Sequence, residues 1–345
     1  MSRGAASRRA WLGSVWLWGV VASVVLVASI VVSVGLGAAD IRPEEVFASI
    51  TAHLGLTEPV LSPLRDGIIW ELRLTRVLTA AAVGGGLALC GAVMQALTRN
   101  PLADPYLLGL SSGASLGAVA VIVLGASLVL PVAAFAGALV ALAATLALAS
   151  AAGGVTPTRT VLAGVAVSAL AAALTSFVIF WSAKGDSYRE ILSWLLGSLG
   201  GANWSTVAIA VVALVVIGVP VVASGRVLDA FAFGDSAASA LGVNVPGVRW
   251  GLLGATALLT GAMVSVSGSI GFIGLVVPHA VRLLVGSRHR SLLPLAAITG
   301  AIVLVWADTI ARTAFEPREL PVGIVTAIIG APVFALILAR KRGVS

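Results

Sequence analysis

Few residues of this chain could do chemistry within the apolar runs that dominate its sequence. Asp308 is the one acidic residue well inside such a run, and Arg312 follows it at i+4. A carboxylate at membrane depth is typical of a proton or ion relay, whereas an arginine one helical turn away is typical of a local ion pair. We favour the ion pair and keep the relay as the mark of an alternative function, that of an ion-coupled carrier.

The sequence also lacks the residues of a nucleotide-hydrolysing engine. Its two lysines, Lys184 and Lys341, do not close a GxxxxGK[ST] loop, in which backbone N–H groups and the lysine bind phosphate. Cys90 is the single cysteine and lies in an apolar run, and His279 has no second His or Cys near it in the sequence, so neither indicates a metal site. We therefore expect no catalytic residue, no metal and no cofactor, and any ATP hydrolysis must occur on another polypeptide.

A polar segment rich in glycine and proline interrupts the apolar sequence. A glycine-rich helix leads into residues 99–105 (RNPLADP), and residues 109–114 (GLSSGA) open the next helix. Gly and Pro at this density leave backbone groups without helical partners, which a membrane tolerates only where the backbone lines a cavity or packs on protein. We interpret this segment as part of a solute path.

The composition is that of a polytopic membrane protein. Of 345 residues, 59% are hydrophobic and 10% are charged, against about 25% charged in soluble domains, and the mean hydropathy is +1.09. Runs of roughly 20 apolar residues, long enough to cross a bilayer, recur along the chain. We predict one all-α domain, residues 1–345, with ten membrane-spanning helices near residues 14–36, 69–97, 110–126, 131–151, 159–182, 204–223, 246–267, 269–285, 291–313 and 320–339.

The first of these spans has a second interpretation. Arg3, Arg8 and Arg9 precede it and small residues follow it at 37–39, as in a secretory signal peptide. Its apolar core exceeds the roughly 7–15 residues of a signal sequence, so we favour a retained helix.

Ten spans place both termini on one side of the membrane. Arginine and lysine gather in the tails and short loops on that side, and the positive-inside rule makes it the cytoplasm. Residues 1–13 and 340–345 are then cytoplasmic tails. The charge of +7 is spread between spans and so does not suggest a nucleic-acid surface.

Two connections are longer than turns. Residues 184–203 are expected to hold a short amphipathic helix in the outer interface. Residues 225–246 form the longest inner connection, where we expect Asp235 to cap a helix that begins at Ser236 and Gly242 to end it after Leu241. Such a helix is either a simple connector or an element that docks into a groove of a soluble partner.

Several motifs, in order along the chain, resemble those of the FecCD family of ABC importer permeases. They are residues 73–76 (RLTR), 91–95 (GAVMQ), 100–105 (NPLADP), 268–279 (GSIGFIGLVVPH), 307–312 (ADTIAR) and 319–334 (ELPVGIVTAIIGAPVF). The likeness extends from about residue 65 to residue 340. Thr75 departs from it, because many members have Pro there.

The resemblance implies a type II ABC importer in the bacterial cytoplasmic (inner) membrane. Its partners would be a second permease copy, identical or homologous, two cytoplasmic ABC ATPase subunits and an extracytoplasmic substrate-binding protein. The cargo would be a metal chelate that crosses by alternating access. An iron chelate, either a siderophore complex or haem, is our first expectation, and cobalamin is the alternative within the family.

The resemblance also implies roles for three groups of residues. Outward arginines would receive acidic side chains of the binding protein: Arg73, Arg76 and Arg312. The ATPase would contact the inner loop at Asp235, Ser236, Ala238, Leu241 and Gly242. The translocation path and its gate would include Gln95, Asn100, Leu102, Thr156 and Thr158. As a polar residue within a span, Gln95 could equally bond to a neighbouring helix, and the arginines could be interfacial side chains.

Overall fold

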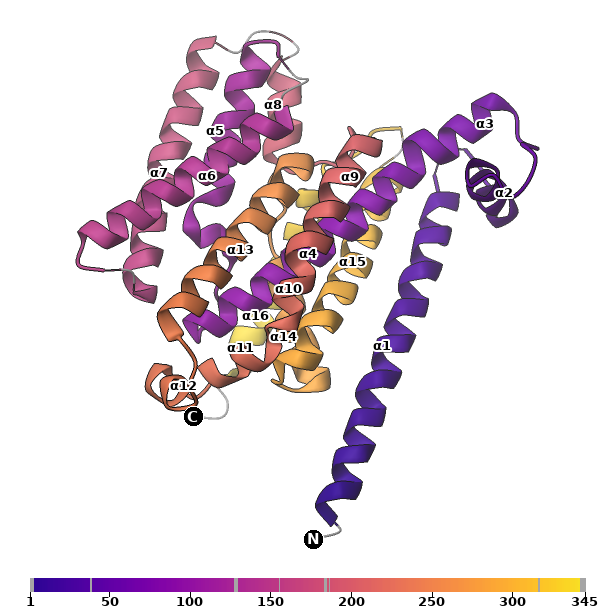
Figure 1. The fold of residues 1–345 in the computed structure, drawn as a ribbon. Coiled ribbons are helices and arrows are strands. Elements are labelled where there is room, and N and C mark those ends of the chain that lie inside the picture. Colours follow the sequence, from indigo (N-terminus) through magenta and orange to yellow (C-terminus); the bar gives the residue numbers. More distant parts are fainter. Residues whose placement is uncertain are drawn as a thin grey trace.

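The protein is a bundle of helices in its computed structural model (Figure 1), which describes residues 3–37, 39–126, 130–154, 156–182, 185, 187–315 and 317–341. Throughout these ranges every regular element is helical, which confirms the predicted all-α class. Lys184 and residues 342–345 of the predicted C-terminal tail lie outside the described residues.

The helices follow one another closely along the chain. The first half contains α1 (Arg3–Gly35), α2 (Pro43–His53), α3 (Pro63–Gly67), the π-helix η1 (Ile68–Leu74), α4 (Thr75–Thr98), the 3-10 helix η2 (Pro105–Leu108), α5 (Leu110–Val123), α6 (Leu130–Ala151) and α7 (Pro157–Ser182). The second half contains α8 (Ser187–Leu195), α9 (Trp204–Ala213), the π-helix η4 (Leu214–Gly218), α10 (Val219–Ala223), α11 (Gly225–Phe231), α12 (Asp235–Ala240), α13 (Val245–Ser267), α14 (Ile273–Val285), α15 (His289–Thr313) and α16 (Val322–Lys341).

Among the described residues, seven helical runs are long and apolar enough to cross a membrane. They are Trp16–Gly35, Pro63–Thr98, Leu130–Ala151, Thr158–Ser182, Trp204–Ala223, Val245–Ser267 and His289–Thr313. Three shorter apolar helices complete the set: Leu110–Val123, Ile273–Val285 and Val322–Ile337. Each of the ten predicted ranges overlaps one of these helices, and for the three short ones a full crossing stays a prediction.

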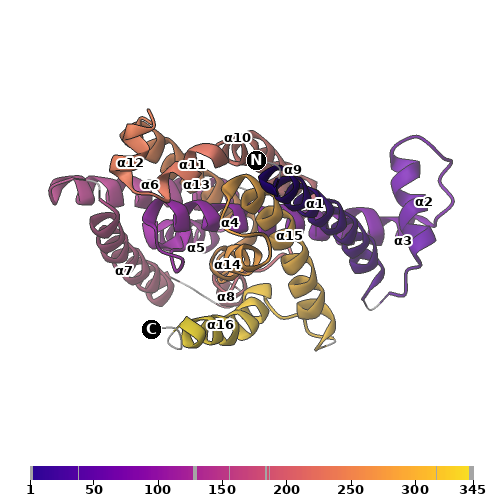
Figure 2. The same ribbon diagram turned by 90° about the horizontal axis from the view of Figure 1, so that it is seen from below.

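Helix α4 is the centre of the bundle, surrounded by α9, α13, α14 and α15 (Figures 1 and 2). Nearly all of its residues are buried. The glycines in its sequence explain how: a Cβ on Gly84 would collide with the carbonyl oxygen of Gly300 in α15, and one on Gly91 with that of Gly274 in α14. Small residues at helix contacts let two backbones approach closely in membrane proteins.

Two irregular segments meet beside α4, at residues 99–109 and 268–272. The Tyr106 hydroxyl donates to the Ile270 carbonyl at 3.0 Å and accepts from the Ile270 N–H at 3.2 Å. The Ser111 hydroxyl donates to that of Ser269 at 2.8 Å. The Tyr106 contacts give partners to backbone groups of Ile270 that no helix satisfies, as required at membrane depth.

Both described ends of the chain, together with α11 and α12, lie at one end of the bundle, and α2, α3 and α8 lie at the other (Figure 1). We call these the inner and outer ends. Helix α8 confirms the short helix predicted within residues 184–203. The sequence analysis did not foresee α2 and α3. Helix α1 begins at Arg3, so residues 3–13 of the predicted N-terminal tail are helical.

Candidate functional site

The three arginines predicted to face a binding protein gather at the outer end of the bundle. Arg73 comes from η1, Arg76 from α4 and Arg312 from α15. With Gly37, Ile68, Leu72, Pro317 and Glu319 they line one pocket of about 330 Å³. We name Arg73, Arg76 and Arg312, with Asp308 and Glu319, the outer arginine cluster.

Arg76 carries the strongest interactions of the outer arginine cluster. Its Nε and one terminal nitrogen donate to the two oxygens of Asp308 at 2.9 and 3.0 Å, and its other terminal nitrogen donates to Glu319 at 2.6 Å. Asp308 is only 1% exposed, whereas Glu319 is 55% exposed. A forked, buried arginine–carboxylate pair is both strong and directional.

The local ion pair that the sequence suggests is present, but it is not the main interaction of Asp308. The Nε of Arg312 lies 3.9 Å from Asp308, which is too long for a hydrogen bond, so the principal partner of Asp308 is Arg76 of another helix. A one-turn spacing within one helix shows which side chains can meet, but it carries no information about a competing donor on a neighbouring helix.

Arg73 and Arg312 bind the end of α1. Arg73 donates to the carbonyl oxygens of Val34, Gly35 and Ala39 at 2.9, 3.0 and 2.7 Å. Arg312 donates to those of Ser33 and Leu36. The last carbonyls of a helix lack helical partners and carry partial negative charge. Both cations therefore cap α1. Arg312 is also within ion-pair distance of Asp308, whereas the described hydrogen bonds of Arg73 all go to carbonyl oxygens.

The predicted gate residues lie toward the inner end. Asn100 follows α4, and its side-chain oxygen accepts from the backbone N–H of Leu102 at 3.0 Å. Both residues are exposed, as are Thr156 and Thr158 at the start of α7. A cavity of about 20 Å³ is lined jointly by Thr156 and by Met94, Leu97 and Thr98 of α4. The end of α4 and the start of α7 thus face the same small cavity.

Gln95 is buried between α4 and α14. Its amide nitrogen donates to the Leu275 carbonyl at 3.1 Å, and its amide oxygen accepts from Arg282 at 3.1 Å. With 3% of its surface exposed, it bonds neighbouring helix residues in this conformation, which is one of the two interpretations that its residue type allows.

The inner loop forms two short helices, α11 and α12. Gly234 occupies the N-cap of α12 at φ 96°, a region that favours glycine, and Asp235 is the first helical residue. The predicted cap by Asp235 is therefore wrong: its carboxylate accepts from Arg249 of α13 at 2.8 and 2.9 Å. The predicted stop is confirmed, because Gly242 follows the helix at φ 82°.

The residues predicted to contact an ATPase differ in exposure. Ser236, Leu241 and Gly242 are exposed, and Leu241 is 70% exposed. Phe233, which the sequence analysis did not single out, is 77% exposed on the same loop. Ala238 is fully buried, so it supports the loop from inside. The inner loop therefore presents two large apolar side chains at its surface.

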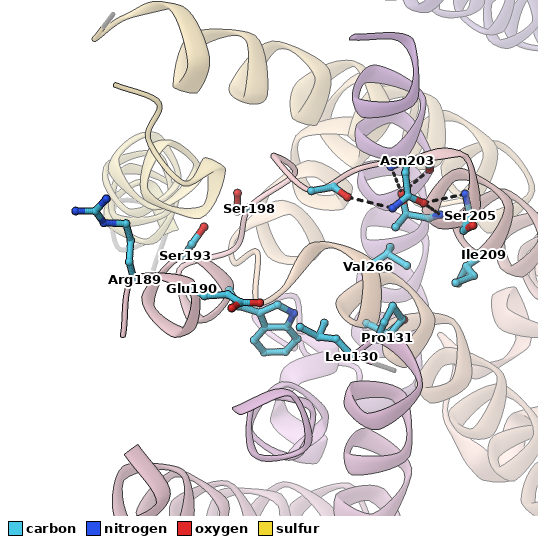
Figure 3. A pocket seen from close by; sticks show the side chains of 14 residues that line it. Leu130, Pro131, Arg189, Glu190, Ser193, Ser198, Asn203, Ser205, Ile209 and Val266 are labelled. Carbon is cyan, nitrogen blue, oxygen red and sulfur yellow. Dashed lines mark hydrogen bonds between the residues drawn. The ribbon is translucent and has the colours of Figure 1, made fainter. Parts of the chain in front are cut away.

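A pocket of about 840 Å³ lies near the outer end, between α8, α9 and the adjoining ends of α6 and α13. In Figure 3, Glu190, Ser193, Ser198 and Asn203 border it, while Arg189 points away. Asn203 is already engaged, because its side-chain oxygen accepts from the N–H groups of Ser205 and Thr206 and so caps α9. No predicted site residue lines this pocket.

Comparison with known proteins decides the family. The model of the FecCD transport family matches residues 25–340. The chain belongs to the FecCD transport family. This FecCD chain is 43% identical to the cobalamin import system permease protein of Halobacterium salinarum, over 95% of its own length and 96% of the relative. It is 45% identical to the Fe(3+) dicitrate transport system permease protein of Escherichia coli, over 80% and 86%.

A solved structure agrees with the assignment. A structure described as an inward-facing conformation of a metal-chelate type ABC transporter superposes on the FecCD chain with a TM-score of 0.80 and 31% identity, covering 93% of this chain and 98% of the other. The protein is thus a multi-pass permease subunit of an ABC importer in the cytoplasmic (inner) membrane. Across the described residues, no three His, Cys, Asp or Glu side chains gather to hold a metal ion.

Two contacts of the FecCD chain, made by Glu319 and Tyr106, were not predicted from the sequence. Glu319 lies within a motif that carried the resemblance, but its contact with Arg76 joins residues 243 positions apart. Tyr106 follows the 99–105 segment directly, and its bond to Ile270 spans 164 positions. The sequence does show a tyrosine beside a polar, proline-containing segment, but this does not indicate which residue the tyrosine bonds.

The two carboxylates on Arg76 should differ sharply in their importance for stability. We expect Asp308→Asn to lower the free energy of unfolding by about 3–5 kcal/mol, because it leaves a largely buried guanidinium without its buried charge partner. The matched change Glu319→Gln removes a half-exposed partner and should cost no more than about 1 kcal/mol.

Unfolding of both variants in detergent, followed by tryptophan fluorescence, measures the difference. Equal loss of stability in the two variants would show that Asp308 is not the partner that secures Arg76.

Proposed function

We propose that this FecCD permease imports an iron chelate, a siderophore complex or haem, by alternating access driven by ATP hydrolysis on two separate ABC ATPase subunits. The observation that supports the proposal best is its similarity, over most of both chains, to permeases that import ferric citrate and cobalamin. Both cargoes are chelated metals. Cobalamin remains the second candidate, because that relative matches along 95% of this chain.

The absence of a phosphate-binding loop from the sequence supports separate ATPase subunits. The inner loop with α12 is the proposed contact, through the exposed Ser236, Leu241 and Gly242 and the apolar side chain of Phe233. Asp235 would fix the tilt of α12 through Arg249, and Ala238 would hold it against the bundle. ATP binding would then shift the populations of inward-open and outward-open states by moving α12.

The outer arginine cluster is the proposed contact for the binding protein. Three arginines share two carboxylates there, Asp308 and Glu319, so the cluster has a surplus positive charge that suits an acidic partner. Arg73 is bound to neutral carbonyls, which leaves its charge available across the pocket. An acidic side chain of the partner would displace the half-exposed carboxylate of Glu319 and would itself pair with Arg76.

A second permease copy would complete the path. Apolar side chains stand exposed on α7, including Phe177, Phe180 and Trp181, and on α16, including Ile328 and Leu336. The two helices lie on the same side of the bundle in Figure 2. We propose that the path runs between two copies, with Asn100, Leu102, Thr156 and Thr158 at its inner gate and Gln95 behind them in the bundle wall.

An ion-coupled carrier is the weaker account. Membership of the FecCD family makes the chain a permease of an ABC importer. In addition, Asp308 accepts a forked hydrogen bond from Arg76, and protonating it would break two charge-assisted bonds. A proton relay would need a carboxylate that is free to lose and regain its proton.

The proposed ATPase contact predicts the behaviour of Leu241 variants. We expect Leu241→Asp to abolish co-purification of the ATPase, because it places a charge at the centre of an apolar contact. Leu241→Met keeps the size and polarity of the side chain and should co-purify as the unchanged chain does.

Affinity purification of the permease co-expressed with ABC ATPases of the same cell measures both variants. Full recovery of the ATPase with Leu241→Asp would place the contact elsewhere. Because Leu241 is highly exposed, neither substitution should disturb folding. Each variant must elute as a folded protein in size-exclusion chromatography for the comparison to hold.

The proposed binding-protein contact predicts that the charge of Arg73 matters more than its shape. We expect Arg73→Gln to weaken docking of the binding protein and Arg73→Lys, which keeps the charge, to retain more of it. Binding to the permease in nanodiscs, measured at low and high salt, tests this. An affinity that is the same for both variants and the unchanged chain would remove the outer arginine cluster from the interface.

A further inference from the structure

Arg249, near the start of α13, contacts both short helices of the inner loop, which lie beside it in Figure 1. Its Nη2 donates to the two carboxylate oxygens of Asp235 in α12 at 2.8 and 2.9 Å. Its guanidinium carbon lies 5.6 Å from the centroid of the Phe231 ring in α11, within the range of a cation–π interaction. One side chain of a spanning helix therefore contacts α11 and α12 together.

The same side chain lies at the proposed inner gate. Arg249 lines the cavity of about 20 Å³ together with Thr156 at the start of α7 and Thr98 at the end of α4. Thr156 is one of the proposed gate residues, and Asn100 of the gate follows Thr98 by two positions. Only 17% of the Arg249 side chain is exposed, so most of its surface contacts the protein. Arg249 therefore connects the inner loop with the wall of the gate cavity.

The other short helix, α11, has an anchor of its own. The Asp229 carboxylate accepts from the backbone N–H of His289 at 2.8 Å and lies 2.8 Å from Nδ1 of its ring, which joins α11 to α15. Between α11 and α12 lie residues 232–234, and Gly234 has a φ of 96°, in a region that favours glycine. This arrangement allows α12 to tilt about Gly234 while α11 stays on α15.

A second arginine connects α12 with the other gate segment. A Cβ on Gly234 would lie 3.2 Å from a terminal nitrogen of Arg99, so this guanidinium packs against the N-cap of α12. Arg99 ends α4 at a φ of 51° and directly precedes Asn100. The inner loop thus meets both sides of the proposed gate through arginines, and Arg249 adds a forked ion pair to this contact.

We propose that Arg249 is a positioning residue that transmits movement of α12 to the inner gate. The proposal rests on the proposed ATPase contact at α12 and adds the route from that contact to the gate. A forked pair is directional, so α12 cannot turn without moving Arg249 or breaking two charge-assisted hydrogen bonds. Because Arg249 borders the cavity between α4 and α7 and a packed interior transmits displacement, its movement repacks Thr98 and Thr156.

A fluorescent label at the gate tests the link. Cys90→Ala removes the one native cysteine, and Thr158→Cys, at an exposed position in the first turn of α7, carries a bimane label. The labelled full-length permease is assembled with its ABC ATPase in nanodiscs. Fluorescence is followed when ATP is added with vanadate, which holds the ATPase in its closed state, and the amount of bound ATPase is measured on the same samples.

Arg249→Met is compared with Arg290→Met. The first change keeps an unbranched side chain near Phe231 and removes the guanidinium, whereas Arg290 is an exposed arginine in the first turn of α15. Coupling between two sites commonly shifts an equilibrium by about 5–150-fold. We expect Arg249→Met to bind the ATPase and to lower the ATP-dependent shift of the gate at least about fivefold. Arg290→Met should respond as the unchanged chain does.

Asp235→Asn separates the link from a general loss of stability. If Arg249 acts through Asp235, the variant with both changes should lose no more of the gate response than Arg249→Met alone. Losses that multiply would contradict a route through this pair. Should Arg249→Met not fold, Arg249→Lys takes its place, because it keeps the charge facing Asp235 but lacks the fork and should also weaken the gate response.

The outcomes distinguish the link from the proposed function on which it rests. A full gate response in Arg249→Met, or in its lysine replacement, would overturn the link and leave the proposed ATPase contact intact. Loss of ATPase binding in that variant would overturn the link as well, because Arg249 would then shape the contact surface instead of transmitting movement. If the unchanged chain binds no ATPase, or if its label does not respond to ATP, the proposed contact or gate fails and the link fails with it.

Discussion

The structure depends on the requirement that backbone groups inside a membrane find partners within the protein. This chain breaks its helices at residues 99–109 and 268–272, and a side chain of the first break bonds backbone groups of the second. The Tyr106 hydroxyl serves both backbone groups of Ile270, and the Ser198 N–H donates to the Ser267 carbonyl at 2.9 Å beside it. Irregular backbone can therefore persist at the centre of the bundle, close to the end of α4 where the proposed gate begins.

The same requirement organises the outer end by electrostatic means. Helix α1 ends with unpaired carbonyls, and Arg73 and Arg312 bind them. Arg76 is held instead by Asp308, which joins α4 to α15. Because a buried charge is costly unless it is paired, this arrangement ties three helices together while leaving the outer arginine cluster short of carboxylates. A surface built for internal stability thus also carries the charge that an acidic partner would recognise.

The sequence was most informative where a signal is long or local. The ten apolar runs, the short helix α8 and the turn at Gly242 follow from hydropathy and from glycine alone, and all are helices or turns where predicted. The family was recognisable because its motifs are long and ordered. By contrast, the N-cap prediction for Asp235 failed because Arg249 of α13 competes for the carboxylate.

Long-range pairing could not be read from one sequence. The Arg76–Asp308 fork and the Tyr106–Ile270 contact depend on which helices become neighbours, and hydropathy does not specify this.

The most direct test of the central claim is uptake into proteoliposomes that contain this permease and its ABC ATPase, with ATP enclosed. A binding protein loaded with ferric siderophore, haem or cobalamin is added outside. The account predicts that one iron chelate accumulates, that accumulation requires both ATP and the binding protein, and that a proton gradient does not replace ATP. Accumulation driven by a proton gradient without ATP would contradict it, and ATP-driven uptake of cobalamin alone would keep the importer but replace the proposed cargo.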